Sequence, residues 1–168
     1  MGHKIPDVDS IGAGIGIYRA AKSLNKKTHI VVNNPTMSVR PIIQTFKDNP
    51  DYDENMFISS DEARDIVDDN TVVVVVDTNK PSYTECEDLL HMSKTIVVLD
   101  HHRQGSEVIQ NAVLSYIEPY ASSACEMVAE ILQYFSVDIR IYNIEADALY
   151  SGIIIDTNIF TSKTGVRT

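Results

Sequence analysis

The chain has no tryptophan, only two cysteines among its 168 residues, and far fewer basic than acidic side chains. Cys86 and Cys125 show no CxxC spacing, so neither a disulfide framework nor a thiolate metal site is expected, and both should be reduced thiols in a reducing compartment. With 14 lysines and arginines against 24 acidic residues, the net charge is −10. This balance excludes non-specific binding to long nucleic acid, which needs a basic surface.

Long apolar runs are also absent. No stretch approaches the ~18 residues of a membrane span, and the polar start of the chain, Met1-Gly2-His3-Lys4, does not resemble a signal peptide. We therefore expect a cytoplasmic chain that makes no membrane contact itself. Its length suffices for one domain with a sizeable core.

What the sequence does contain is an alternation of short apolar runs and helix-like periodicity. Strands are predicted at 28–32, 56–58, 71–76, 95–99 and 113–117, and helices at 11–24, 39–47, 60–67, 81–91, 122–135 and 144–155. Asp9 or Ser10 would cap the first helix. Strands separated by helices imply right-handed crossovers and parallel pairing. The predicted fold is a three-layer α/β domain with a mostly parallel sheet of about five strands flanked by helices.

Acidic and imidazole side chains follow several of the apolar segments. Asp100-His101-His102 comes directly after a predicted buried strand, which would deliver these side chains to the sheet edge where ligands bind. The same kind of side chain occurs in three further places: His3-x-x-x-Asp7-x-Asp9, Asp77 after five valines, and Asp156 after three isoleucines.

Five carboxylates that converge cannot all stay ionised without positive charge, because like charges raise one another's pKa. No Lys or Arg stands at the matching positions, and divalent cations are the natural alternative. Aspartate and histidine without thiolate suit a harder metal such as Mn²⁺, and the set is large enough for a two-metal hydrolytic site. Asp77, on the central strand, is the candidate bridging ligand.

Several of these carboxylates also have a purely structural interpretation, as turn or helix-capping residues: Asp7, Asp9, Asp77 and Asp156. The adjacent His101 and His102 are harder to explain in this way, since two imidazoles after a buried strand have no obvious packing role. The structural interpretations are independent of one another, and we therefore favour the metal site.

In their order and spacing, these motifs resemble those of the DHH phosphoesterase superfamily. The amino-acid sequences of three segments most resemble those of the membrane-anchored cyclic-di-AMP phosphodiesterases of Gram-positive bacteria: Gly2–Ala13, Asp100–Arg103 and Ile117–Glu126. The resemblance implies that residues 1–168 form a DHH domain cut at both ends. The C-terminal substrate-binding domain would be absent, and the parent protein would be anchored in the cell membrane.

The resemblance also implies a role for each residue of the site. His3 and Asp7 would bind one Mn²⁺, and Asp9, His101 and Asp156 the other, with Asp77 bridging. Asp100 would orient the imidazoles, His102 would face the phosphate, and Arg103 would contact substrate or brace its loop. The implied reaction is hydrolysis of cyclic-di-AMP to linear pApA by metal-bound hydroxide.

Two other functions remain open from the sequence. The chain can be another DHH phosphoesterase, an oligoribonuclease or an inorganic pyrophosphatase, since these enzymes share the metal motifs. It can also be a non-catalytic module for metal binding or dimerisation, and a homodimer is compatible with any of these functions. The segment Glu118–Ser123 favours the dinucleotide enzymes, through resemblance alone.

Overall fold

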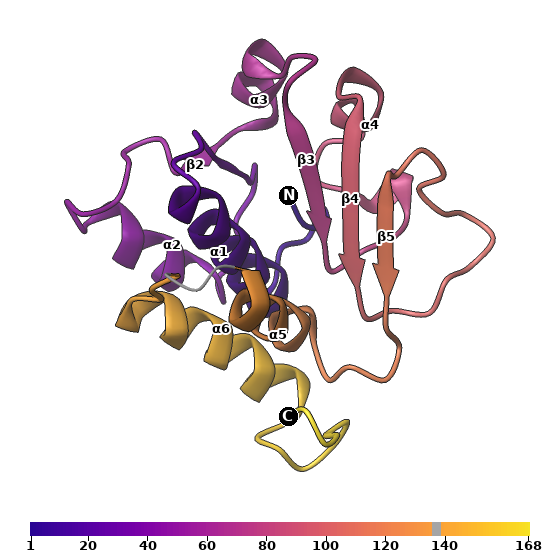
Figure 1. The fold of residues 1–168 in the computed structure, drawn as a ribbon. Helices are drawn as coiled ribbons and strands as arrows, with labels where there is room; N and C mark the ends of the chain where they lie inside the picture. Colours follow the sequence, from indigo (N-terminus) through magenta and orange to yellow (C-terminus); the bar gives the residue numbers. More distant parts are fainter. Residues whose placement is uncertain (136–138) are drawn as a thin grey trace.

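The computed structural model describes residues 1–135 and 139–168 as a mixed α/β fold (Figure 1). The strands are β1 (Ile30–Val31), β2 (Phe57–Ile58), β3 (Val72–Val76), β4 (Thr95–Asp100) and β5 (Leu114–Ile117). The helices are α1 (Val8–Ser23), α2 (Arg40–Lys47), α3 (Ser60–Ile66), α4 (Leu89–Met92), α5 (Ala124–Phe135) and α6 (Asn143–Asp156), with a 3₁₀ turn at Pro81–Tyr83. Within the described ranges, no helix is both long and apolar enough to cross a membrane.

The strands pair in two groups, and every pairing is parallel. β1 pairs with β2, while β4 lies between β3 and β5. Met1 lies beside β3: its amine donates to the Val74 carbonyl at 2.8 Å, and the Val76 N–H donates to the Met1 carbonyl at 3.0 Å. The extended start of the chain thus places His3 near the carboxyl end of β3 without a full strand of its own.

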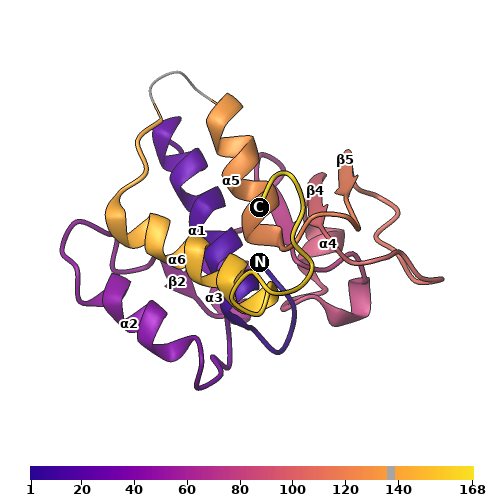
Figure 2. The same cartoon turned by 90° about the horizontal axis from the view of Figure 1, so that it is seen from below.

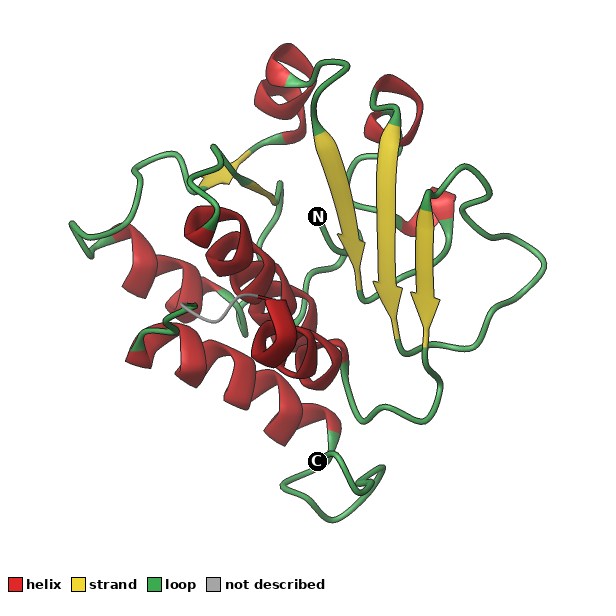
Figure 3. Cartoon of the chain, viewed as in Figure 1, coloured by secondary structure: helices red, strands yellow, loops and turns green. Residues whose placement is uncertain are grey.

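The five predicted strands form two parallel sheets instead of one, drawn in yellow in Figure 3. Helices pack on both faces of the β3-β4-β5 sheet, as the predicted layers require. Alternation along the valine strand explains how it is buried on both sides. Val73 and Val75 belong to a cluster with residues of α3 and α4, whereas Val74 and Val76 pack in a cluster formed with α1, α5 and α6. Figure 2 shows α1 between α5 and α6, consistent with the contacts that these three helices share.

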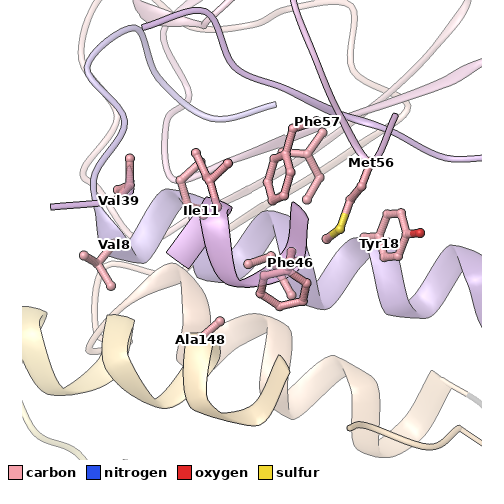
Figure 4. Close-up of a cluster of buried hydrophobic side chains, with 11 residues drawn as sticks. Val8, Ile11, Tyr18, Val39, Phe46, Met56, Phe57 and Ala148 are labelled. Atoms are coloured by element: carbon pink, nitrogen blue, oxygen red, sulfur yellow. The ribbon is translucent and has the colours of Figure 1, made fainter. Parts of the chain in front are cut away.

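A separate apolar cluster fixes α1 against the first two strands and α2 (Figure 4). Ile11, Ile15 and Tyr18 of α1 face Phe46 of α2 and Met56 next to β2. These side chains are nearly inaccessible to water. Since α1 begins directly after Asp7, this packing holds one wall of the candidate site rigidly in place.

Two predicted elements differ from the structure. The helix predicted at 81–91 is instead a 3₁₀ turn followed by the single helical turn α4. The intervening backbone pairs with the start of the chain, because His3 forms a β-bridge with Thr84 and the Glu85 N–H donates to the Gly2 carbonyl. The cap of α1 is Asp7, not Asp9 or Ser10, and the Asp7 carboxylate accepts the Ser10 N–H at 2.9 Å.

Candidate metal centre

The predicted metal ligands converge where several elements end. Asp77 follows β3, His101 follows β4, and Asp156 is the last residue of α6. Asp7 and Asp9 stand at the start of α1. The structure therefore brings together all six residues proposed from the sequence as metal ligands: His3, Asp7, Asp9, Asp77, His101 and Asp156.

One potential ligand set consists of His3, Asp7 and Asp77. The His3 Nε2 atom lies 3.5 Å from Asp7 Oδ2 and 3.3 Å from Asp77 Oδ2. The Asp7 carboxylate is both a helix cap and a potential metal ligand, since Oδ1 caps α1 while Oδ2 faces His3. The capping bond fixes the carboxylate without occupying the oxygen that points into the site.

A second potential set consists of Asp9, His101 and Asp156. The His101 Nε2 atom lies 3.7 Å from Asp9 Oδ2 and 3.5 Å from Asp156 Oδ2. The same nitrogen is 3.3 Å from Asp77 Oδ1. Because Asp77 presents one oxygen to His3 and the other to His101, its carboxylate stands between the two sets.

The backbone of Asp77 is unusual for a non-glycine residue. Its φ is 61°, in the left-handed region, directly at the end of β3. The conformation is secured by a hydrogen bond from the Asp77 N–H to the Leu99 carbonyl at 2.9 Å. Such strained residues persist where the surrounding structure over-determines them, and they cluster at functional sites. Here the conformation directs the carboxylate of Asp77, a residue that is 2% exposed, toward both His3 and His101.

Asp9 is held by the start of α5. Its carboxylate accepts the backbone N–H of Ala124 at 2.7 Å and that of Cys125 at 2.8 Å. The positive end of the helix dipole favours a negative charge at this position. Gly152 lets α6 approach closely, since a Cβ at this position would collide with Cys125 Sγ and lie 3.0 Å from Asp9 Oδ1.

The electrostatics of the site couple its imidazoles to its carboxylates. Burial lowers the pKa of His3, but hydrogen bonds and ion pairs with Asp7 and Asp77 outweigh it and raise that pKa to about 10. The pKa of His101 is raised to about 9 in the same way, since its attraction to Asp77, Asp9 and Asp156 exceeds the effect of burial. In the protein without metal, these two protons supply the positive charge that the carboxylates need.

The carboxylates show the converse effect. Burial and the negative charge of Asp77 raise the pKa of Asp9 to about 7, despite the hydrogen bond from Cys125. Burial also raises the pKa of Asp156, with a further contribution from Asp77. Across the described part of the chain, no lysine or arginine forms an ion pair with any of these carboxylates.

The residues present fit a divalent cation. The buried atoms Asp77 Oδ1 and His101 Nε2 lie 3.3 Å apart, but neither makes a hydrogen bond of good geometry among the described residues. Buried polar atoms are rarely left so, and a cation bound between them would satisfy both. The donor set of carboxylate oxygens and imidazole nitrogens, without thiolate, suits Mn²⁺ or a metal of similar hardness.

Asp100 serves one imidazole of the pair. Its carboxylate lies 2.8 Å from His102 Nδ1 and accepts the Asn79 side-chain N–H at 2.5 Å. His101 points instead toward Asp9, Asp77 and Asp156. The side chain of His102 is 58% exposed, so its ring combines a fixed Nδ1 with an accessible face. The hydrogen bond to Asp100 raises the pKa of His102 above its usual value.

Arg103 is exposed, and among the described residues its guanidinium forms no ion pair. Other contributors were missed by the sequence prediction: Asn79, the amides of Ala124 and Cys125, and Gly152. Asn79 follows Asp77 by two residues and was readable as part of a turn. The amides that contact Asp9 lie more than a hundred residues away in the chain, so no local sequence pattern could predict these hydrogen bonds.

Comparison with known proteins shows which family the chain resembles in sequence. Residues 1–153 match the model of the DHH family, N-terminal domain. The chain is 47% identical over 172 residues to the cyclic-di-AMP phosphodiesterase GdpP of Bacillus subtilis (strain 168), and 38% identical over 170 residues to the cyclic-di-AMP phosphodiesterase PdeA of Listeria monocytogenes serotype 1/2a (strain 10403S). Each match covers 100% of this chain but 26% of the relative.

A solved structure shares the fold. The exopolyphosphatase-related protein from Bacteroides fragilis superimposes with a TM-score of 0.77 at 21% identity, over 99% of this chain and 47% of that one. At this identity the likeness concerns the arrangement of helices and strands. The sequence match covers nearly the whole chain, and the chain belongs to the DHH family.

Proposed function

We propose that this chain is the hydrolytic domain of a two-metal phosphodiesterase that opens cyclic-di-AMP to linear pApA with Mn²⁺. The observation that carries the proposal is the position of Asp77, whose two oxygens face His3 and His101 in two adjacent ligand sets. The names of the Bacillus and Listeria relatives support the substrate. Because the chain spans about a quarter of their length, the substrate of the whole relatives is itself part of the proposal.

In this proposal His3 and Asp7 hold one cation, Asp9, His101 and Asp156 hold the other, and Asp77 contacts both. Two divalent cations there would lower the pKa of a bound water and offset the charge of the phosphodiester. The α5 amides favour the ionised form of Asp9 and would hold its carboxylate toward its cation. The capping bond from Ser10 does the same for Asp7.

His102 and Arg103 would act on the substrate. Asp100 holds His102 through Nδ1, which leaves the other ring nitrogen to donate a hydrogen bond or proton to a phosphate oxygen. The exposure of its side chain is compatible with contact to a bound ligand. Arg103, next in the chain and also exposed, can add a charged contact to the phosphate. Asp100 is then a positioning residue, since it acts through His102.

The test is product analysis with the purified chain in Mn²⁺. Cyclic-di-AMP, pApA, inorganic pyrophosphate and bis-p-nitrophenyl phosphate are each incubated with the chain and with its Asp77→Asn variant. We expect hydrolysis of both diesters, pApA as the first product from cyclic-di-AMP, and loss of both activities in the variant. Turnover of pyrophosphate alone would favour the pyrophosphatase alternative, and no turnover of any substrate would favour a non-catalytic metal module.

A further inference from the structure

A shallow hollow of about 400 Å³ begins at Arg103, the residue after His102, and apart from Arg103 its lining residues have no part in the mechanism above. Its lining residues are Arg103, Gln104, Ile117, Pro119 and Tyr120. They come from the segment after β4 and from the end of β5 and the loop that follows it. The hollow therefore combines two segments at the carboxyl edge of the sheet, where ligands bind in folds of this class.

The hollow adjoins the residues proposed to face the phosphate. Ile117 pairs with Asp100 in the register of β4 and β5, and the Glu118 N–H donates to the Asp100 carbonyl at 2.9 Å. On the other side, Arg103 is bonded directly to His102 in the chain. A phosphodiester at His102 would thus have one of its nucleosides within reach of the hollow.

Tyr120 gives the hollow an aromatic wall. Its side chain is 90% exposed, and among the described residues it stacks on no other aromatic ring. The loop is restrained by Pro119, which fixes one backbone dihedral, and by a hydrogen bond from the Tyr120 N–H to Glu118 Oε1 at 3.2 Å. An exposed ring on a restrained loop is a suitable platform for a planar ligand, because little order is lost when the ligand stacks.

The remaining lining residues match the other parts of a nucleotide. Ile117 and Pro119 offer apolar surface for the face of a base. The Gln104 amide carries a donor and an acceptor together, which complements the adjacent N6 donor and N7 acceptor of adenine. Arg103 offers a cation for phosphate or for stacking.

We infer that this hollow is a nucleobase subsite, in which an adenine attached to the scissile phosphate stacks on Tyr120 and meets Gln104 at its edge. The inference rests on the proposed function for the position of the phosphate. It adds a binding site for one base, made by the chain itself, and it names Tyr120 as the residue that holds it.

The test compares two ligands that share a sugar phosphate and differ in the base. AMP and ribose 5-phosphate are titrated by calorimetry into the Mn²⁺-loaded chain. Base stacking on an aromatic ring predicts that AMP binds about 5- to 150-fold more tightly. Tyr120→Ala should bring the ratio to within about twofold, whereas Tyr120→Phe, which keeps the ring, should retain the preference. Tyr134, 83% exposed near the end of α5 and outside the hollow, supplies the matched control Tyr134→Ala.

The subsite would be overturned by no binding of AMP, by equal binding of AMP and ribose 5-phosphate, or by an AMP preference that survives in Tyr120→Ala. An equal loss in Tyr134→Ala would show that the effect is not local to the hollow, and would overturn it as well. Hydrolysis of bis-p-nitrophenyl phosphate by the unmodified chain keeps the two proposals apart, because this substrate has no base. Without that activity the proposed function fails, while the AMP preference still decides the subsite.

Discussion

The carboxylate of Asp9 accepts the backbone N–H of Cys125 at 2.8 Å, although the two residues stand 116 positions apart in the chain. The contact joins the start of α1 to the start of α5. It depends on the close approach of α6, where Gly152 faces both residues. The position of a candidate metal ligand is therefore set by packing among three helices.

Replacing Gly152 with alanine should disturb this contact. The added methyl group would collide with Cys125 Sγ and press on Asp9, and overpacking of this kind costs about 1–3 kcal/mol of stability. Denaturant unfolding of the metal-free chain and a Mn²⁺ titration should show lower stability and weaker binding of at least one ion. Gly105→Ala is the control, since nothing lies within 4 Å of its Cβ position. Equal behaviour of the two variants would refute this role of Gly152.

Asp77→Asn should lose both metal ions while the chain stays folded. Asparagine has nearly the same shape and tolerates the positive φ of this position, but it lacks the charge with which one carboxylate can serve two cations. Elemental analysis after gel filtration in Mn²⁺ should give two ions per chain for the unmodified protein and none for the variant. Full occupancy in Asp77→Asn would rule out the bridging role.

The two adjacent histidines should behave differently. His101 is buried among Asp9, Asp77 and Asp156, so His101→Ala should weaken metal binding. His102 is exposed and held by Asp100, so His102→Ala should keep both ions and lower kcat on bis-p-nitrophenyl phosphate by about 10²- to 10⁴-fold, the usual contribution of a general acid. Metal content and kinetics measured on the same preparations decide the matter, and the opposite pattern would exchange the two assignments.

The elements that the sequence predicted correctly are those with strong local signals. Val73 to Val76 alternate between two apolar clusters, as expected for a strand buried on both faces, while Val72 at the start of the strand is exposed. The helix predicted at 81–91 was wrong, because backbone pairing with the start of the chain outweighs the helical pattern of this segment. Thr84 and Glu85 pair there with the backbone of residues 2–3. Asp77, His101 and Asp156 were predictable because each follows an apolar run, whereas His3, Asp7 and Asp9 were predicted from their close spacing at the start of the chain. The α5 amides on Asp9 and the φ of Asp77 were not, since both arise only from the assembled fold.

The pKa values predict how the metal-free chain responds to pH. Those of His3 and His101 are raised from 6.5 to about 10 and about 9, so each proton stabilises the folded state. This contribution is complete below pH 6.5 and is lost as the pH rises through the folded values. The effect of the two histidines on stability is best measured above pH 8. Below pH 8 the Met1 amine also changes protonation between the folded and unfolded chain, because burial lowers its pKa from 8.0 to about 6.

Thermal unfolding in EDTA should therefore show a lower midpoint at pH 10 than at pH 8. The change should be smaller in His3→Gln, which removes one of the two groups. Mn²⁺ affinity should move in the opposite direction and increase from pH 6.5 to pH 8, because each cation displaces protons from its ligands. A midpoint that rises from pH 8 to pH 10 in the metal-free chain would contradict this account of the charges.

The central claim is that two cations share Asp77. Anomalous diffraction at the manganese edge, from crystals of the chain grown with Mn²⁺, tests it most directly. We predict two peaks about 3.5–4 Å apart, one beside His3 and Asp7 and the other beside Asp9, His101 and Asp156, with the Asp77 carboxylate between them. A single peak, or two peaks that do not share Asp77, would contradict the two-metal site.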